Sequence, residues 1–86
     1  MPRNRSEKDL PPTEVRYNGT KVWRDEGGLM HRDNGPAIEG NDGYKAWYIH
    51  GKRHREDGPA IEYSNGGKEW WHNGRFIRLE KPDSAT

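Results

Sequence analysis

The sequence predicts an all-β domain, a meander of tandem β-hairpins, on the strength of two observations. The block HRDNGPAIE at residues 31–39 returns as HREDGPAIE at residues 54–62, with seven of nine positions identical. The dipeptides Asn18-Gly19, Asp42-Gly43 and Asn65-Gly66 recur 24 and then 23 residues apart. A copy at a fixed period marks a repeat architecture. Asn-Gly or Asp-Gly between β-forming residues is the strongest short hairpin signal, since both residues tolerate positive φ.

Length and composition indicate one small folded domain. The 86 residues are 28% hydrophobic and carry a net charge of +1, with four Trp and four Tyr. So few aliphatic residues are typical of disordered chains, but a near-neutral chain has no strong self-repulsion to keep it open. Aromatic side chains bury a large area each. We therefore expect a folded domain whose core is aromatic rather than aliphatic.

The chain divides into three predicted segments. Residues 1–13 read as a flexible, proline-containing N-terminal arm, residues 14–81 as a single hairpin-repeat domain, and residues 82–86 as a flexible tail. The absence of cysteine excludes disulfides and thiolate metal sites. No apolar run has the length of a membrane span or a signal-peptide core. We expect a cytoplasmic protein with no cofactor and no membrane contact.

The repeated unit also contains a tryptophan. Trp23, Trp47 and Trp70 follow the three turn dipeptides at the same distance, each with a Lys two residues before it and a Gly four residues after it. Clusters such as Gly35-Pro36 and Gly58-Pro59 end strand pairing, because proline donates no ladder hydrogen bond. Frequent glycine and the lack of a 3.6-residue apolar period predict no helix. This pattern predicts five to seven short antiparallel strands.

Strand alternation separates the tryptophans from their neighbours in sequence. Successive side chains point to opposite faces, so the repeated tryptophans are expected to stack from unit to unit as core residues. The next position varies, being Arg24, Tyr48 and Trp71. A varying, amphipathic and aromatic position is typical of a contact surface. The alternative is that Tyr48 and Trp71 widen a second small core.

The duplicated His-Arg-acid block admits a chemical and a structural interpretation. His50, His54, Glu56 and Asp57 have the side chains of a divalent metal site, or of a nuclease pair. An active site is needed only once, however, whereas these residues recur, so a structural role is favoured and no metal or catalytic site is predicted. The residues expected to be structural are Trp23, Trp47, Trp70, Gly35, Pro36, Asp57, Gly58 and Pro59.

Three contacts are predicted for the block. Arg32 and Arg55 are expected to stack on a Trp of the adjacent unit. The acid that follows, Asp33 or Glu56, is expected to pair with an arginine. The next position, Asn34 or Asp57, is expected to form an Asx turn ahead of Gly-Pro.

Residues 52–55 are the densest basic run of the chain. Together with exposed aromatic residues such a run fits single-stranded nucleic acid. Acidic residues are mixed through the same strands, and the pI of about 8.1 is below the usual nucleic-acid footprint. A protein partner is therefore favoured, and nucleic acid stays an alternative. The predicted partner-binding residues are Arg24, Tyr48, Trp71, Lys52, Arg53 and Arg75.

The period and the repeated words over residues 12–80 resemble divergent MORN-type repeats, and similar words occur in short repeat proteins of phages, bacteria and giant viruses. The resemblance implies a binding or scaffolding role rather than an enzyme. The chain lacks the Tyr-x-Gly-x-x-x-x-Gly pattern of typical MORN units, so a lipid role is not carried over. We expect a phage or mobile-element protein that binds and inhibits a host protein, such as a CRISPR component of bacterial immunity. Unpaired edge strands also predict a homodimer.

Overall fold

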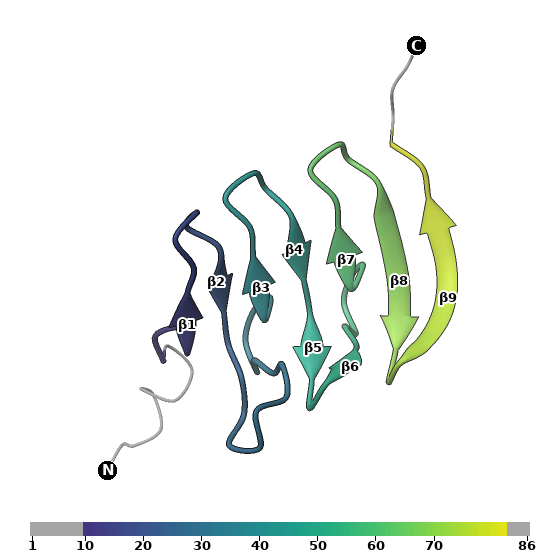
Figure 1. Ribbon diagram of the computed structural model, residues 1–86. Helices are drawn as coiled ribbons and strands as arrows, with labels where there is room; N and C mark the ends of the chain where they lie inside the picture. Colours follow the sequence, from purple (N-terminus) through teal and green to yellow (C-terminus); the bar gives the residue numbers. More distant parts are fainter. Residues whose placement is uncertain (1–9, 83–86) are drawn as a thin grey trace.

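The computed structural model describes residues 10–82, and the chain there is all-β, as predicted. Seven strands form one antiparallel sheet in the order β1-β2-β3-β4-β7-β8-β9, and β5 pairs with β6 (Figure 1). No helix, and so none that could cross a membrane, is found in this part. The strands are β1 Glu14–Val15, β2 Lys21–Val22, β3 Ile38–Glu39, β4 Lys45–Ala46, β5 Tyr48–Ile49, β6 Lys52–Arg53, β7 Ile61–Glu62, β8 Lys68–His72 and β9 Arg75–Glu80.

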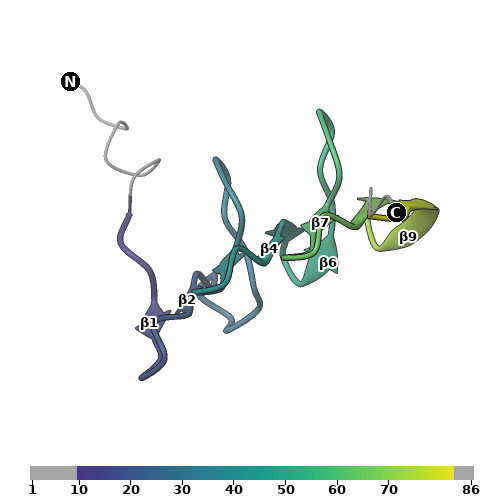
Figure 2. The same ribbon diagram turned by 90° about the horizontal axis from the view of Figure 1, so that it is seen from above.

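The main sheet is a single layer. From above, its strands form one row that runs from β1 to β9 (Figure 2). The molecule is correspondingly elongated, with extents of 51 × 29 × 24 Å. Nine strands exceed the predicted five to seven, because the continuation of β4 forms its own short hairpin, β5–β6. Within residues 10–82 no second layer covers either face, so the core has to be built on the sheet itself.

The three predicted hairpin turns form, with a different backbone geometry from the expected one. Only the glycine has positive φ, at +91° in Gly19, +101° in Gly43 and +96° in Gly66. The preceding Asn or Asp instead uses its side-chain oxygen to accept the N–H two residues on, as Asn18 does from Thr20 at 3.0 Å. This is the three-residue hairpin with a glycine in the left-handed region, rather than a two-residue turn.

The two-residue turns lie at the other end of the strands. His50 and Asn73 have φ of +47° and +51°, and the glycines that follow them, Gly51 and Gly74, are also positive. Two successive positive φ angles define a type I′ turn, which matches the twist of paired strands. These turns close the β5–β6 and β8–β9 hairpins.

The strand register gives each face a distinct row. One row alternates in charge from strand to strand, and we call its side the ladder face; its members are Lys21, Glu39, Lys45, Glu62, Lys68 and Glu80. The neighbouring row, on the opposite face, is apolar at Val22, Ile38, Ala46 and Ile61. Opposite charges directly across a strand pair stabilise a sheet. A one-residue slip would exchange the two faces, so this pattern fixes the register.

The predicted aromatic core is wrong in its composition. Five of the six buried hydrophobic residues are aliphatic, and Trp23, at 7% exposure, is the one aromatic member. Trp47 and Trp70 are only half-buried. A single layer has no opposing sheet to enclose an indole ring, whereas small side chains fit between adjacent strands. The aliphatic members are Val22, Ala37, Ala46, Ala60 and Ile61.

The last residues of the predicted N-terminal arm contact the hairpin domain. Residues 1–9 and 83–86, most of the arm and tail, lie outside the described residues. Leu10 and Thr13, by contrast, contact the domain: the Leu10 carbonyl accepts the Trp23 indole N–H at 2.9 Å, and Thr13 Oγ1 accepts the Arg24 N–H at 2.9 Å. Residues 10–13 therefore belong to the domain, where they cover the edge of the first tryptophan.

Candidate functional site

Each repeated tryptophan is covered by an arginine. The guanidinium carbon lies 3.7 Å from the ring centroid for Arg32 over Trp23, 3.8 Å for Arg55 over Trp47, and 3.7 Å for Arg78 over Trp70. In the two blocks the same arginine donates to the carbonyl of the Gly-Pro proline and to the ladder-face glutamate, each at 3.1 Å. This Trp–Arg–Glu cluster takes the place of a covering layer.

The predicted contacts of the block need three corrections. Each arginine stacks on the tryptophan of its own unit, because the Gly-Pro turn folds the block back onto the strand it follows. The arginine pairs with the glutamate that ends the block, Glu39 or Glu62, since that side chain lies on the ladder face. Asp33 instead contacts His31. Asp57, with an 89% exposed side chain, accepts from Arg55 Nε at 3.2 Å rather than making the expected Asx turn.

The duplicated histidines join one copy to the next. His31 Nδ1 accepts the backbone N–H of His50, and His54 Nδ1 accepts that of Asn73, both at 2.9 Å. These donors are the first residues of the two type I′ turns. The second ring nitrogen faces an acid, Asp33 at 3.0 Å or Glu56 at 3.4 Å. One ring nitrogen therefore holds the next turn, while the other contacts an acid of the same block. We call the hydrogen bond from the turn N–H to histidine Nδ1 the histidine latch.

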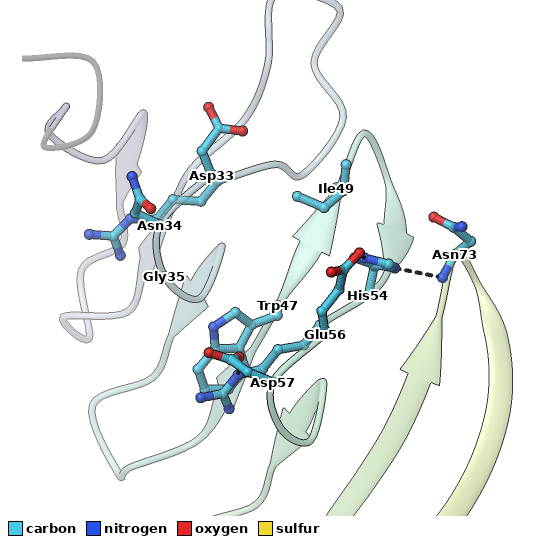
Figure 3. Close-up of a pocket in the computed structure, with 11 residues that line it drawn as sticks. Asp33, Asn34, Gly35, Trp47, Ile49, His54, Glu56, Asp57 and Asn73 are labelled. Carbon is cyan, nitrogen blue, oxygen red and sulfur yellow. Dashed lines mark hydrogen bonds and ion pairs between the residues drawn. The ribbon is translucent and has the colours of Figure 1, made fainter. Parts of the chain in front are cut away.

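A groove of about 850 Å³ separates the two blocks (Figure 3). Asp33 and Asn34 lie on one side of it, while Glu56 and Asp57 lie on the other, near Trp47. Its titratable members belong to the clusters just described: Arg55 stacks on Trp47, and His54 holds the Asn73 turn. The rim is acidic, and its carboxylates are exposed. The groove is thus the space between the two duplicated blocks, lined by residues that also hold those blocks together.

The side of the sheet opposite the ladder face carries a group of aromatic residues in contact with one another or with shared polar neighbours. We call this group the aromatic face; its members are Tyr44, Tyr48, Tyr63, Trp71 and Phe76. Arg53 lies 4.7 Å from the Trp71 ring centroid and donates to Tyr48 Oη at 3.3 Å. Glu69 accepts from the Tyr63 hydroxyl at 2.9 Å and from the Trp71 indole N–H at 2.8 Å. The group is therefore held in one arrangement by its own polar contacts.

Burial within the aromatic face is graded. Tyr44, Tyr48 and Trp71 are half-buried, whereas Tyr63 and Phe76 are 37% and 51% exposed. Burial is the main cause of the raised pKa of Tyr44. The half-buried members thus form the second small core that the sequence left open as an alternative. The exposed members extend it outward as a surface.

The six residues predicted to bind a partner do not form one set. Tyr48 and Trp71 belong to the aromatic face, and Arg53 contacts both of them. Lys52 and Arg75 are exposed near the two type I′ turns. Arg24 instead lies near the N-terminal edge, where it pairs with Glu14 at 3.3 Å. Hydrogen bonds from Arg16 and then Arg24 lower the pKa of Glu14. Tyr44, Tyr63 and Phe76 were missed, although alternation from Ala46, Ile61 and the β8–β9 hairpin would have placed them.

The stacking prediction is tested by Arg55. We expect Arg55→Ala to lower the free energy of unfolding by about 2 kcal/mol, because it removes a half-buried cation–π contact and three hydrogen bonds, one of them to the exposed Asp57. Arg55→Lys should recover only part of the lost stability, since an ammonium group lacks the planar guanidinium with its several N–H donors. Urea unfolding measures both. The matched control is Arg16→Ala, whose side chain is 49% exposed; an equal loss there would contradict the prediction.

The histidine latch is tested by a pair of substitutions. His54→Ala removes the acceptor of the Asn73 N–H and should lower stability by about 1 kcal/mol. His54→Asn places an oxygen near the position of Nδ1 and should restore most of it. Hydrogen exchange of the Asn73 amide reads the bond directly. Equal destabilisation by Ala and Asn, with unchanged exchange, would show that the latch does not form.

Asp25 gives a prediction for pH. Hydrogen bonds from His50, and then from the Leu29 and Gly27 N–H groups, lower the pKa of the Asp25 carboxyl below 3.8. Its contribution to stability is therefore present above that value and is lost as the pH falls through the lowered pKa. In metal-free protein, the stability difference between the wild type and Asp25→Asn should stay constant down to about pH 5 and then shrink as the pH falls to about 2.5, because the carboxyl is protonated there. A difference constant across this range would be the contrary result.

Comparisons with known proteins add no residue to the site. No protein-family model matches the chain, and no curated protein or solved structure matches it. Its candidate binding surface is therefore defined by its own geometry: the exposed part of the aromatic face, on the side of the sheet away from the Trp–Arg–Glu clusters.

Proposed function

We propose that this chain is a non-catalytic protein-binding module that acts through the aromatic face. The observation that carries the proposal is the combination of exposure and order there. Tyr63 and Phe76 of this face are 37% and 51% exposed. Leu79, which pairs with Glu69 across β8–β9, is 52% exposed. They lie beside the half-buried Trp71 and Arg53. Aromatic residues and arginine are enriched in interface cores. Side chains held before binding lose little conformational entropy when a partner docks.

We further propose that the domain is an array of MORN-like hairpin units. The Trp–Arg stack recurs three times, and the arginines Arg32, Arg55 and Arg78 are spaced by 23 residues. The histidine latch recurs twice with the same 2.9 Å bond. The third unit keeps Arg78 but has Ile77 at the histidine position, which is expected of a terminal unit with no following turn to hold.

As the partner we propose a host protein, in line with the resemblance to short phage and bacterial repeat proteins. Components of bacterial immunity, CRISPR effectors among them, are the first candidates. A protein that inhibits by covering a surface needs a rigid face and no reacting groups. The histidines are consistent with this, because the Nδ1 atoms of His31 and His54 each accept a backbone N–H of the fold.

Nucleic-acid binding is the second candidate, favoured by one observation. Arg53 brings positive charge to Trp71. Lys52 precedes it in the sequence, and Arg75 follows Gly74, whose N–H donates to the Arg53 carbonyl. Aromatic stacking with basic residues is how single strands bind. Glu69 lies within the same group, and the ladder face alternates in sign. A protein partner therefore fits the charge pattern better.

The proposal is tested with Trp71→Ala and Phe76→Ala. In a pull-down from bacterial lysate followed by titration against the purified partner, each should weaken binding at least about tenfold, because truncated aromatic anchors commonly cost over 1 kcal/mol. The melting temperature distinguishes loss of contact from loss of fold. Tyr17→Ala is the matched control, since Tyr17 is fully exposed at the β1–β2 turn, away from the aromatic face.

Two results would contradict this function. Binding unaffected by Trp71→Ala and Phe76→Ala in folded protein would exclude the aromatic face as the contact surface. A gel shift with single-stranded oligonucleotides that weakens steeply as salt rises would establish the nucleic-acid alternative instead.

A further inference from the structure

A cluster of potential metal ligands lies where the first unit meets the second. Asp25, His31 and His50 each bring one ligand-type atom within 4.8 Å of the others. His50 Nδ1 lies 2.8 Å from Asp25 Oδ2, and His31 Nε2 lies 3.0 Å from Asp33 Oδ1. Imidazole nitrogens and carboxylate oxygens are zinc ligands. No residue of the aromatic face takes part.

The junction between the second and third units can be compared with this junction between the first and second. The histidine latch forms at both, with the same 2.9 Å hydrogen bond, but Asn73 occupies the position that His50 has at the first junction. Likewise, two residues after the tryptophan, Ile49 stands where the first unit has Asp25. The latch therefore needs neither of these ligand-type side chains. At the first junction, both of these differences place a potential metal ligand close to His31.

The turn itself does not account for His50. Its φ is +47°, in a region that Asn also enters readily, and Asn73 forms the corresponding turn. The His50 ring is 64% exposed and stacks on the His31 ring at a centroid distance of 4.1 Å. A bulkier residue in a sparsely populated conformation is a reason to look for function.

The two carboxylate oxygens of Asp25 have different roles, and one of them faces this junction. Its Oδ1 accepts the N–H groups of Gly27 and Leu29, each at 2.9 Å, and so shapes the longer first-unit loop. Its Oδ2 is directed at His50. The side chain is only 16% exposed, and His31 is 17% exposed. Two of the three groups are thus already held in place.

We propose that Asp25, His31 and His50, with Asp33 beside them, bind one divalent transition-metal ion of the zinc class. The ion replaces the proton between His50 Nδ1 and Asp25 Oδ2. His31 offers Nε2, since its Nδ1 accepts the His50 N–H. Ligand distances of about 2.0–2.2 Å require the cluster to contract, and the exposed His50 ring has room to turn inward. The bound ion cross-links the first two units.

The test uses untagged protein, because a polyhistidine tag would itself bind zinc. After treatment with a chelator and its removal, isothermal titration with ZnCl₂ at neutral pH should show one equivalent bound. The melting temperature should rise with Zn²⁺, because a ligand that binds only the folded state stabilises it. Absorption of the Co²⁺-loaded protein reports the coordination geometry.

The decisive variant gives the first junction the residues of the second, Asp25→Ile with His50→Asn. It should retain the fold and lose zinc affinity by more than the roughly 10–100-fold that an outer-shell change brings. His72→Ala is the control, because His72 packs against His54 outside the cluster. This variant should bind zinc as the wild type does. No binding by the wild type, or equal binding by the junction variant, would overturn the proposal. A single His50→Asn variant provides the same comparison if the double variant does not fold.

Discussion

The structure depends on the stacking of an arginine on a tryptophan, tied to a glutamate of the sheet. Over residues 10–82 the strands form one layer, so no opposing sheet or helix shields the indole rings. The guanidinium plane covers each ring, and in the two duplicated blocks its N–H groups also satisfy a carbonyl and a carboxylate. A planar, always-charged group is suited to both tasks at once. The chain can therefore remain strongly polar and still cover its largest apolar side chains.

Much of the architecture could be predicted from the duplicated residues. Asn-Gly and Asp-Gly located the three hairpins, and the spacing of the tryptophans set the period of the strands. Predictions that depend only on neighbouring residues agree with the structure. Gly19 adopts the positive φ expected of a turn glycine, and Trp70 and Trp71 contact different arginines on opposite faces, as strand alternation predicts. Such features depend on a few neighbouring residues and on no distant partner.

Other features could not be predicted because they depend on how distant segments meet. Nothing local shows whether Arg32 stacks on its own unit or on the next, or that His31 accepts a hydrogen bond from a turn 19 residues away. The aromatic core was overestimated because composition does not reveal the number of layers. Alanines at positions 37, 46 and 60 are fully buried, since the gap between adjacent strands admits little more than a methyl group.

Comparison of the copies separates structural residues from variable ones. Duplicated residues make the same contacts in both blocks: arginine to proline carbonyl, arginine to glutamate, histidine to turn amide. Several positions that differ, such as Tyr48 against Trp71 or His50 against Asn73, lie on the aromatic face or at the junctions. The fold thus leaves a small number of positions open to specialise without loosening the array.

The strand order has a consequence for how copies of this chain can associate. Every neighbour in the seven-stranded sheet is antiparallel, so the first and last strands, β1 and β9, point the same way. Head-to-tail stacking would make these two edges parallel neighbours, which breaks the alternation. Two β9 edges related by a two-fold axis keep it, because a two-fold contact uses the same edge of both copies in opposite directions. An odd number of strands therefore makes pairing through like edges, rather than head-to-tail addition, the association that continues the antiparallel pattern.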